Sequence, residues 1–296
     1  SAVWALDPTN GTTIWKYSTR NSVKNVLGYE DGIVVVQDSE GYVYALDASE
    51  GSCRWKYRLP YDRPYACDGL TVHNGVVFCG LQGERCALDL QNGRVLWKGE
   101  RLRHETHSCK RDVVIGDCLI SGMQWDCLAA FDIRSGQRLW AQSEHGLRFR
   151  SMSPVSDPED PTMMYIASVD TLHRIRVSTG EIIEKFTFPG YHFEVISKPC
   201  VCDDRVLLAT SNRGLLAVSK STGEVLWNFV PDISLICSSP YSHQPHKGIH
   251  GDILIDEGRC LFGAEDGCIY VLDVRTGTVI QRYPLGVPVF ASLSLE

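Results

Sequence analysis

The sequence lacks a long apolar run, a basic tract and a helical period. No stretch of its 296 residues approaches the roughly 18 apolar residues that a membrane-spanning helix needs, so no transmembrane segment is predicted. The longest basic cluster is the short Cys109–Asp112 segment and the formal net charge is -7, which argues against a nucleic-acid partner. Because no segment keeps a helical period over about 11 residues, we expect the fold to be built from strands.

Paired cysteine motifs are also missing. None of the twelve cysteines forms the C-x-x-C spacing of zinc or dithiol redox sites, and the closest pair is Cys200 and Cys202. So many unpaired thiols keep a reducing, cytoplasmic setting open. Six of them lie in apolar, strand-like runs and are predicted to be small buried hydrophobes: Cys79, Cys86, Cys118, Cys127, Cys260 and Cys268.

One motif recurs along the chain: an acid, a glycine four residues later and a tryptophan four residues after that. Its seven glycines are separated by 40, 42, 43, 44, 43 and 54 residues, a period typical of repeat folds. The copies, three of them altered, are Asp7, Gly11 and Trp15; Asp47, Gly51 and Trp55; Asp89, Gly93 and Trp97; Asp132, Gly136 and Trp140; Arg176, Gly180 and Glu184; Ser219, Gly223 and Trp227; and Asp273, Gly277 and Gln281.

Each period holds four short strand-like runs separated by turn residues. In one copy they are residues 23–29, 32–37, 42–46 and 52–57. Four strands in forty-odd residues predict an all-β fold, a β-propeller of four-stranded antiparallel blades. The acid and the glycine would close a hairpin, and the tryptophan would fill the space between adjacent blades.

The stretches YALDASEGSCRW (residues 44–55), CALDLQNGRVLW (86–97) and LAVSKSTGEVLW (216–227) resemble the repeat of the PQQ-like, quinoprotein-type β-propellers. That family contains quinone dehydrogenases, many of which carry adjacent disulfide-bonded cysteines and a calcium site of Glu, Asn and Asp. It also contains propellers that bind no quinone, such as the lipoprotein of the outer-membrane protein assembly machinery. Here no two cysteines are adjacent and no counterpart of the calcium triad is found. The resemblance therefore implies the non-catalytic branch, with no cofactor and no pyrroloquinoline quinone.

The two ends of the chain are expected to share a blade. Six complete sets of four strands lie between Trp15 and Gln281. Strands at residues 3–6 and 13–17 and a last inner strand at residues 287–295 would form the seventh blade and close the ring, with eight blades as the alternative. We expect one propeller domain over residues 1–296, cut from a longer protein.

Charged residues are predicted at the innermost strands, where the family usually has serines. Alignment of the repeats puts them at the central channel, where converging polar groups could orient a ligand, or alternatively pair with one another. These candidates are Lys24, Asp68, Lys110, Arg111, Asp112 and Lys198.

The longest insertion, between the sixth and seventh copies, forms a second candidate site. Pro245 and Gly248 argue for a loop, and long loops on rigid scaffolds often carry recognition. The loop is expected to contact a ligand or partner, and no metal site is predicted because no helix sets the ligand spacing. Its candidate contacts are Tyr241, His243, His246 and His250; the three histidines and Asp252 are the side chains that could ligate a metal. A separate insertion at residues 157–161 is predicted to be an acidic surface turn.

Three functions follow from these features. The first is a non-catalytic scaffold that binds a protein or glycan partner through one face. The second is an accessory domain that positions substrate in a larger exported enzyme, such as a hydrolase or phosphoesterase; a quinone-dependent oxidoreductase is a third. The family resemblance favours the cell envelope or the exterior as the location, against the reducing setting that the cysteines indicate.

Overall fold

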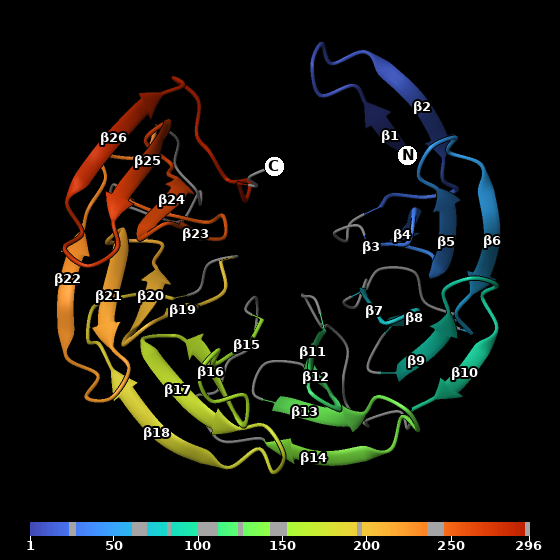
Figure 1. Ribbon diagram of the computed structural model, residues 1–296, viewed down its shortest axis with the longest axis horizontal. Helices are drawn as coiled ribbons and strands as arrows, with labels where there is room; N and C mark the ends of the chain where they lie inside the picture. Colours follow the sequence, from blue (N-terminus) through green and yellow to red (C-terminus); the bar gives the residue numbers. More distant parts are fainter. Residues whose placement is uncertain are drawn as a thin grey trace. The chain divides into compact units, whose positions relative to one another are not determined.

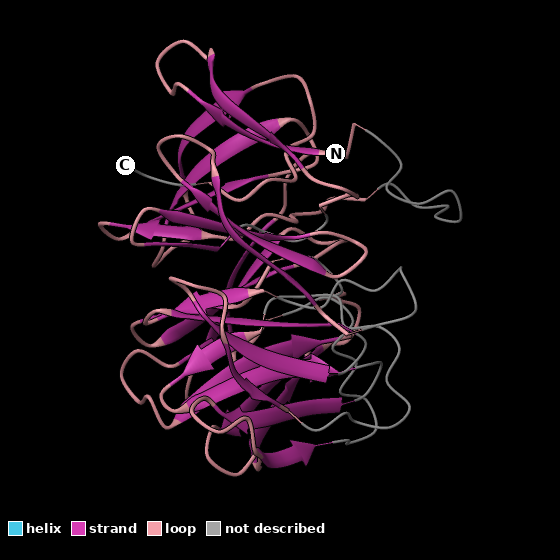
Figure 2. Ribbon diagram, turned by 90° about the vertical axis from the view of Figure 1, so that its right-hand side faces the viewer, coloured by secondary structure: helices cyan, strands magenta, loops and turns pink. Residues whose placement is uncertain are grey.

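The computed structural model describes residues 1–23, 28–60, 70–81, 84–99, 112–123, 127–142, 153–193, 197–235 and 246–293. The chain divides into two compact units, Ser1–Glu144 (unit 1) and His145–Glu296 (unit 2). Within the described ranges the regular structure is entirely strand (Figure 2). The described part of the chain accordingly has no helix with the length and apolar character needed to cross a bilayer.

Unit 1 contains one two-stranded sheet and three four-stranded sheets, all antiparallel and each made of strands in chain order (Figure 1). The first sheet pairs β1 with β2. The strands are β1 (Ala2–Leu6) and β2 (Thr13–Ser18); β3 (Gly28–Glu30), β4 (Ile33–Gln37), β5 (Tyr42–Asp47) and β6 (Cys53–Arg58); β7 (Thr71–His73), β8 (Val76–Leu81), β9 (Glu84–Asp89) and β10 (Val95–Lys98); β11 (Val113–Ile115), β12 (Cys118–Met123), β13 (Cys127–Asp132) and β14 (Arg138–Gln142).

Unit 2 contains three further four-stranded antiparallel sheets with the same order of strands. The strands are β15 (Val155–Ser156), β16 (Met163–Ser168), β17 (Thr171–Arg176) and β18 (Ile182–Thr187); β19 (Cys200–Cys202), β20 (Arg205–Ala209), β21 (Leu215–Ser219) and β22 (Val225–Phe229); β23 (Leu254–Asp256), β24 (Arg259–Gly263), β25 (Cys268–Asp273) and β26 (Val279–Pro284). The predicted six sets of four strands are thereby confirmed.

The second and third strands of each four-stranded sheet form its core because they are β-branched or apolar on both faces. Ile33, Val35 and Val36 in β4, for example, are at most 1% exposed. Both faces are apolar where a sheet lies between two others, as the β7–β10 sheet does in unit 1, whereas the fourth strands β6 and β22 alternate half-buried and exposed side chains. Alternation places one face of the outer strand against the neighbouring sheet and the other in solvent.

The acid and the glycine of the repeat close the turn between the third and fourth strands, as predicted. In the Asp47 turn the Gly51 amide donates to the Asp47 carbonyl oxygen at 2.8 Å, and the Ser49 amide donates to Asp47 Oδ1 at 2.9 Å. The same bonds recur at Asp7, Asp89, Asp132 and Asp273. The turn is therefore one local structure repeated along the chain.

The tryptophan of the repeat joins one sheet to the next. Trp55 of β6 donates from Nε1 to the carbonyl oxygen of Leu90 at 2.7 Å, and a Cβ placed on Gly93 would lie 2.7 Å from its ring. Trp15, Trp97 and Trp227 make the equivalent bonds to Ala48, Ile133 and Val274. Each ring thus rests on the turn glycine of the next sheet and donates to the carbonyl oxygen of the residue that follows the acid of that turn. We call this glycine and this carbonyl group the ring seat.

The last predicted strand is wrong. Residues 287–293 form no strand. Instead the segment crosses the end of the last sheet, where the Val289 amide donates to the Ala264 carbonyl oxygen at 3.1 Å and the Val289 side chain packs against Gly263. Pro288 has no amide hydrogen, so this segment could not have supplied a complete ladder. The strands predicted at residues 3–6 and 13–17 are present as β1 and β2, and closure of the ring stays a prediction.

Burial confirms the cysteine prediction wherever the side chains are described. Cys79, Cys86, Cys118, Cys260 and Cys268 are all buried and free. The burial of the Cys127 side chain lies outside the description. These thiols pack as small apolar groups within strands, so their number reflects core filling.

Candidate functional site

Two of the predicted channel residues, Asp112 and Lys198, fall within the described ranges. Lys24, Asp68, Lys110 and Arg111 lie outside them, as do Tyr241 and His243 of the predicted loop. Asp112 begins the third four-stranded sheet of unit 1, just before β11, and Lys198 precedes β19 in unit 2. The two residues therefore lie in different units.

Asp112 lies in a buried ion pair. Arg85 Nε of β9 is 2.7 Å from Asp112 Oδ2, and both side chains are fully shielded from solvent. Ser121 of β12 accepts from Arg85 Nε at 3.0 Å and donates to Asp112 Oδ1 at 2.7 Å. The Thr71 hydroxyl donates to the Asp112 carbonyl oxygen. The triad links two neighbouring sheets, and its burial leaves the carboxylate no open path to a ligand.

The backbone of Lys198 is hydrogen-bonded to the side chain of Asp252. The Lys198 amide donates to Asp252 Oδ1 at 3.1 Å, and the Asp252 amide donates to Ser292 Oγ at 2.9 Å. These bonds fix the ends of the segments that precede β19 and β23. Asp252 is consequently engaged in holding the backbone of unit 2.

His250 faces a carboxylate that the sequence did not suggest. His250 Nε2 lies 2.6 Å from Glu265 Oε1, and the Glu265 side chain is 1% exposed. Gly248 leaves room for this carboxylate, because a Cβ at that residue would lie 2.9 Å from Glu265 Cδ. Burial raises the pKa of Glu265, but the hydrogen bonds and charge of His250 outweigh it, so the pKa lies below the ordinary 4.5.

This shift predicts a pH dependence of stability. A carboxyl whose pKa is lower in the folded state stabilises the fold fully above about pH 4.5 and loses that contribution as the pH falls through the lower folded pKa. Glu265→Gln should therefore reduce the free energy of unfolding at pH 6 and differ progressively less from the wild type below pH 4.5. Urea denaturation at pH 6 and pH 3.5 measures the difference, and an equal effect at both would contradict the assignment.

His246 is held by backbone contacts. Its Nδ1 lies 3.3 Å from the Ser211 carbonyl oxygen, and its own carbonyl oxygen accepts from the Ser234 amide at 2.9 Å. Among the residues that the structure describes, no three His, Cys, Asp or Glu side chains are grouped to hold a metal. His246, His250 and Asp252 thus each have separate partners in the described part of the loop.

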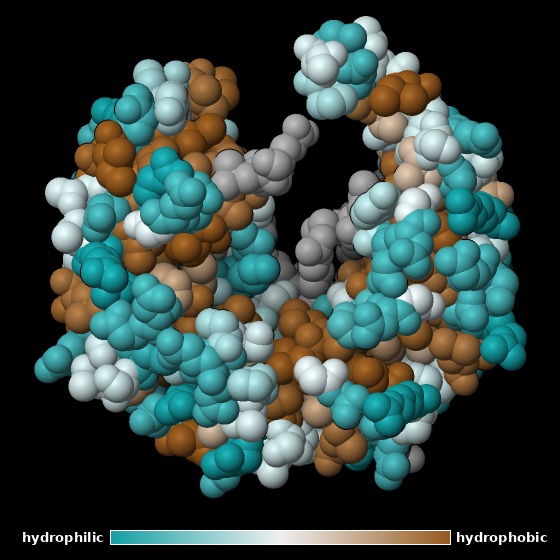
Figure 3. Space-filling view, viewed as in Figure 1, coloured by the Kyte–Doolittle hydropathy of each residue, from teal (hydrophilic) through white to brown (hydrophobic). Residues whose placement is uncertain are grey.

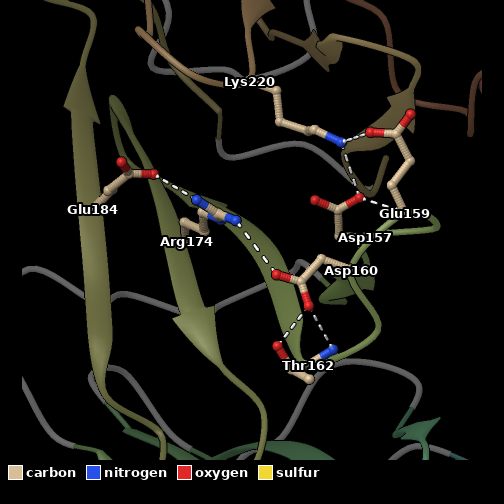
Figure 4. A network of polar contacts seen from close by, with 7 residues as sticks. All are labelled: Asp157, Glu159, Asp160, Thr162, Arg174, Glu184 and Lys220. Carbon is tan, nitrogen blue, oxygen red and sulfur yellow. Dashed lines mark hydrogen bonds and ion pairs between the residues drawn. The ribbon is translucent and has the colours of Figure 1, made fainter.

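The repeat is broken at the β15–β18 sheet. In five sheets an alanine pairs with the tryptophan across the strands, as Ala45 does with Trp55, but here Arg174 pairs with Glu184. Arg174 Nη1 lies 3.2 Å from Glu184 Oε2 (Figure 4). The ring over the next seat is that of Phe186, two residues after the expected position, and it packs against Gly223. An ion pair therefore occupies the place of the tryptophan.

The insertion at residues 157–161 lies beside this ion pair, and it is more than the acidic surface turn that the sequence predicted. Asp157 is 1% exposed, and Lys220 Nζ of the next sheet lies 3.1 Å from Asp157 Oδ1 and 2.5 Å from Glu159 Oε2 (Figure 4). Burial raises the pKa of the adjacent Tyr165 hydroxyl to about 12, so it stays protonated. Asp157 is the buried residue of the insertion, whereas Pro158, Glu159 and Pro161 are exposed and Asp160 is half-buried. The insertion ties two sheets together.

Loss of Lys220 should remove the cation beside the buried Asp157 carboxylate. We expect Lys220→Met to lower the free energy of unfolding by about 1.5–3 kcal/mol, the cost of removing a hydrogen bond to a buried charge. Arg259→Met is a matched control, because its carboxylate partners Asp256 and Glu257 are 36% and 83% exposed, against 1% for Asp157. Chemical denaturation of both variants measures the difference, and equal effects would place Asp157 in solvent.

The described polar clusters pair internally, and several of them bridge neighbouring sheets. A fold of this kind defines a β-propeller of the quinoprotein type. A family model described as outer membrane protein assembly factor BamB matches residues 1–146 and 126–289, so the chain belongs to that family.

Individual relatives agree with the family. The chain is 27% identical over 198 residues to outer membrane protein assembly factor BamB of Salmonella typhimurium, an alignment that covers 64% of this chain and 48% of that protein. It is 28% identical over 158 residues to 1-butanol dehydrogenase (quinone) of Thauera butanivorans, covering 45% of this chain and 25% of the enzyme. The chain thus spans about half the length of the assembly factors it matches.

Solved structures share the fold. BamB from Moraxella catarrhalis has a TM-score of 0.70 at 18% identity, with 97% of this chain and 81% of that chain covered. A europium-containing methanol dehydrogenase has a TM-score of 0.73 at 13% identity, with 98% and 76% covered. At these identities the likeness establishes the propeller fold alone.

Proposed function

We propose that this chain is a non-catalytic propeller scaffold that binds a protein partner in the cell envelope. Membership of the family described as an outer membrane protein assembly factor carries the proposal. An assembly factor, as those relatives are named, acts on other proteins. A scaffold with such a role needs an exposed contact surface more than reactive groups.

The polar groups of the described residues support the scaffold over an enzyme. Arg85 with Asp112, His250 with Glu265, and Lys220 with Asp157 are each paired within their unit. Paired and buried charges hold structure and are poorly placed to meet a substrate. Apolar side chains, in contrast, stand exposed on outer strands, among them Leu96, Leu139, Leu226 and Ile280. We infer that recognition uses this outer surface and its loops.

Quinone-dependent oxidation is the second candidate, because quinone dehydrogenases are among the relatives. The sequence has no adjacent cysteine pair like the one many of those enzymes carry. We therefore propose that the chain acts without pyrroloquinoline quinone. Alcohol oxidation by the purified protein after addition of that quinone and calcium, followed with an artificial electron acceptor, would favour the enzyme instead.

Site-specific photo-crosslinking tests the scaffold. A photoreactive residue is placed singly at the exposed positions Leu96, Leu226 and Ile280, and the protein is irradiated in an envelope fraction of its own organism. We expect discrete protein adducts that disappear when excess unlabelled protein is added. A photoreactive residue at buried Leu46 is the matched control and should give none. Absence of competed adducts at every exposed position contradicts the proposal.

A further inference from the structure

Two cysteines face each other across the second and third strands of the β7–β10 sheet in unit 1. Cys79 of β8 pairs directly with Cys86 of β9 in the antiparallel ladder. Their Sγ atoms lie 3.4 Å apart, and both thiols are free in this structure. The two sulfur atoms are therefore in contact.

The backbone of this pair suits a disulfide bond. Opposite residues of an antiparallel ladder have Cα atoms about 4.5 or 5.5 Å apart, and both spacings fall within the range of about 4.4–6.8 Å found in disulfides. Because the side chains of opposite residues point to the same face of the sheet, rotation about the Cα–Cβ bonds of Cys79 and Cys86 can bring the sulfur atoms to the bonding distance of about 2.05 Å. The bond therefore leaves the register of β8 and β9 unchanged.

Packing alone does not call for two thiols at this position. In every four-stranded sheet the equivalent pair stands one residue before the partner of the repeat's tryptophan position. The other sheets place very different side chains there: Val36 and Tyr44, Ser121 and Ala129, Ile166 and His173, Leu208 and Leu216, and Phe262 and Tyr270. A position that accepts side chains of such different sizes can be filled without sulfur. What the two cysteines add to the β7–β10 sheet is their chemistry.

The thiol pair is buried between two sheets of unit 1. Cys79 and Cys86 are 0% and 5% exposed and belong to an apolar cluster that also contains Val35, Ala45 and Leu88. Figure 3 shows hydrophilic side chains over much of the surface of unit 1, with apolar side chains between them. The hydrogen bond with Cys86 and burial raise the pKa of the Cys79 thiol well above its usual range, so little thiolate is present in the folded unit. Because the thiolate is the reactive form, we expect oxidation while the two sheets are still forming.

We propose that Cys79 and Cys86 are a disulfide-forming pair, which a low-molecular-weight disulfide such as oxidised glutathione oxidises and a thiol reduces again. The Cys86 thiolate attacks one sulfur of the oxidant, which forms a mixed disulfide and releases one thiolate. The Cys79 thiolate then attacks the Cys86 sulfur and releases the second thiolate. The two protons lost by the cysteines go to the two released thiolates, so the protein gains one disulfide and the oxidant becomes two thiols.

This pair is independent of the scaffold function, because it concerns two buried side chains of unit 1 and no partner protein. Refolding in a glutathione redox buffer tests it. The 296-residue protein is reduced, unfolded in urea, diluted into oxidised and reduced glutathione, alkylated with N-ethylmaleimide and digested with trypsin without reduction. Cleavage after Arg85 separates the two cysteines, so a disulfide between them joins two peptides that mass spectrometry detects.

We expect the joined peptides in most of the molecules. Alkylation of both Cys79 and Cys86 in most molecules overturns the proposal. So does linkage of either residue to other cysteines as often as to its partner across the strands.

Single substitutions locate the bond. The tryptic peptide that carries Cys79 also carries Cys67, so Cys67→Ala distinguishes the two and should keep the joined peptides. Cys79→Ala and Cys86→Ala should each abolish them. Cys118→Ala is the matched control, because Cys118 is also buried on the second strand of its sheet, β12, and it should leave the joined peptides unchanged. Joined peptides that persist in Cys79→Ala or vanish in Cys67→Ala would assign the bond to Cys67 and overturn the pair.

Stability shows whether the folded sheets accommodate the bond. A cross-link between residues 79 and 86 restricts the unfolded chain, so the urea midpoint of the oxidised protein should exceed that of the reduced protein by about 0.5–1 M. Dithiothreitol should reverse the shift, and Cys79→Ala, whose fold circular dichroism checks, should show no shift between the two conditions. An oxidised midpoint at or below the reduced one overturns the proposal, because the bond would then strain the sheet that it joins.

Discussion

Replacing Arg85 with alanine is expected to destabilise unit 1 by about 3–5 kcal/mol, the cost of breaking a buried ion pair from one side. The Arg85 and Asp112 side chains are fully buried, with Nε and Oδ2 2.7 Å apart. Without the guanidinium, the Asp112 carboxylate would keep Ser121 but lose the cation that lies 2.7 Å away. A charge held away from water in this way raises the free energy of the folded state.

Urea denaturation followed by tryptophan fluorescence measures this loss. Arg134→Ala is the control, because its ion pair with Asp117 is exposed on both sides and such pairs contribute about 0–1 kcal/mol. Replacing both Arg85 and Asp112 with leucine should recover most of the stability, since an apolar pair of similar volume removes the stranded charge. A single Arg85→Ala variant as stable as Arg134→Ala would place the pair in contact with solvent.

The sheets could be predicted from the sequence because strand signals and turn signals agree at every repeat. Alternating or apolar runs of five or six residues lie between Asp and Gly residues whose bonds to the turn are local. The position of each tryptophan relative to the next glycine then fixes how neighbouring sheets pack, as Trp15 and Gly51 do. Local chemistry repeated seven times leaves few alternative folds.

The ion pairs could not be predicted because their partners lie far apart in the sequence. The repeat itself does mark Arg85 as unusual. Arg85 lies two residues before the alanine that pairs with the tryptophan, and the equivalent residues in other copies are all buried and apolar: Val3, Val43, Leu128 and Leu215. A lone arginine at such a position requires a buried acid, but the frame does not say which one. Likewise Arg174 and Glu184 replace an alanine and a tryptophan, and only the structure brings Asp160 beside them.

The last strand was mispredicted for a different reason. Residues 287–293 have a strand-like composition, but strand formation depends on a partner with free backbone groups. The structure gives Val289 and Ser292 contacts to Ala264 and Asp252 instead. Composition cannot distinguish a ladder from a segment that crosses the end of a sheet.

Trp97→Ala is expected to lower the free energy of unfolding of unit 1 by about 3–5 kcal/mol, the range for removing a large buried aromatic ring. Trp97 is 8% exposed, donates to the Ile133 carbonyl oxygen at 2.8 Å and packs against Phe78 with ring centroids 6.0 Å apart. The variant loses the ring from the apolar contact between two sheets and leaves the Ile133 carbonyl without that donor. Leu96→Ala, at the neighbouring exposed position, should change stability by no more than about 0.5 kcal/mol.

A double-mutant cycle with Gly136 separates the ring seat from general loss of core. A Cβ on Gly136 would lie 2.3 Å from Trp97 Cε3, and the residue has a φ of 71°, so Gly136→Ala adds a steric clash to backbone strain of about 1–3 kcal/mol. Once Trp97 is alanine the clash disappears and only the strain remains. The two losses should therefore sum to more than the loss in the double variant, by at least about 1 kcal/mol. Additive losses would mean that ring and glycine act independently, and the ring seat would no longer explain how these neighbouring sheets pack against each other.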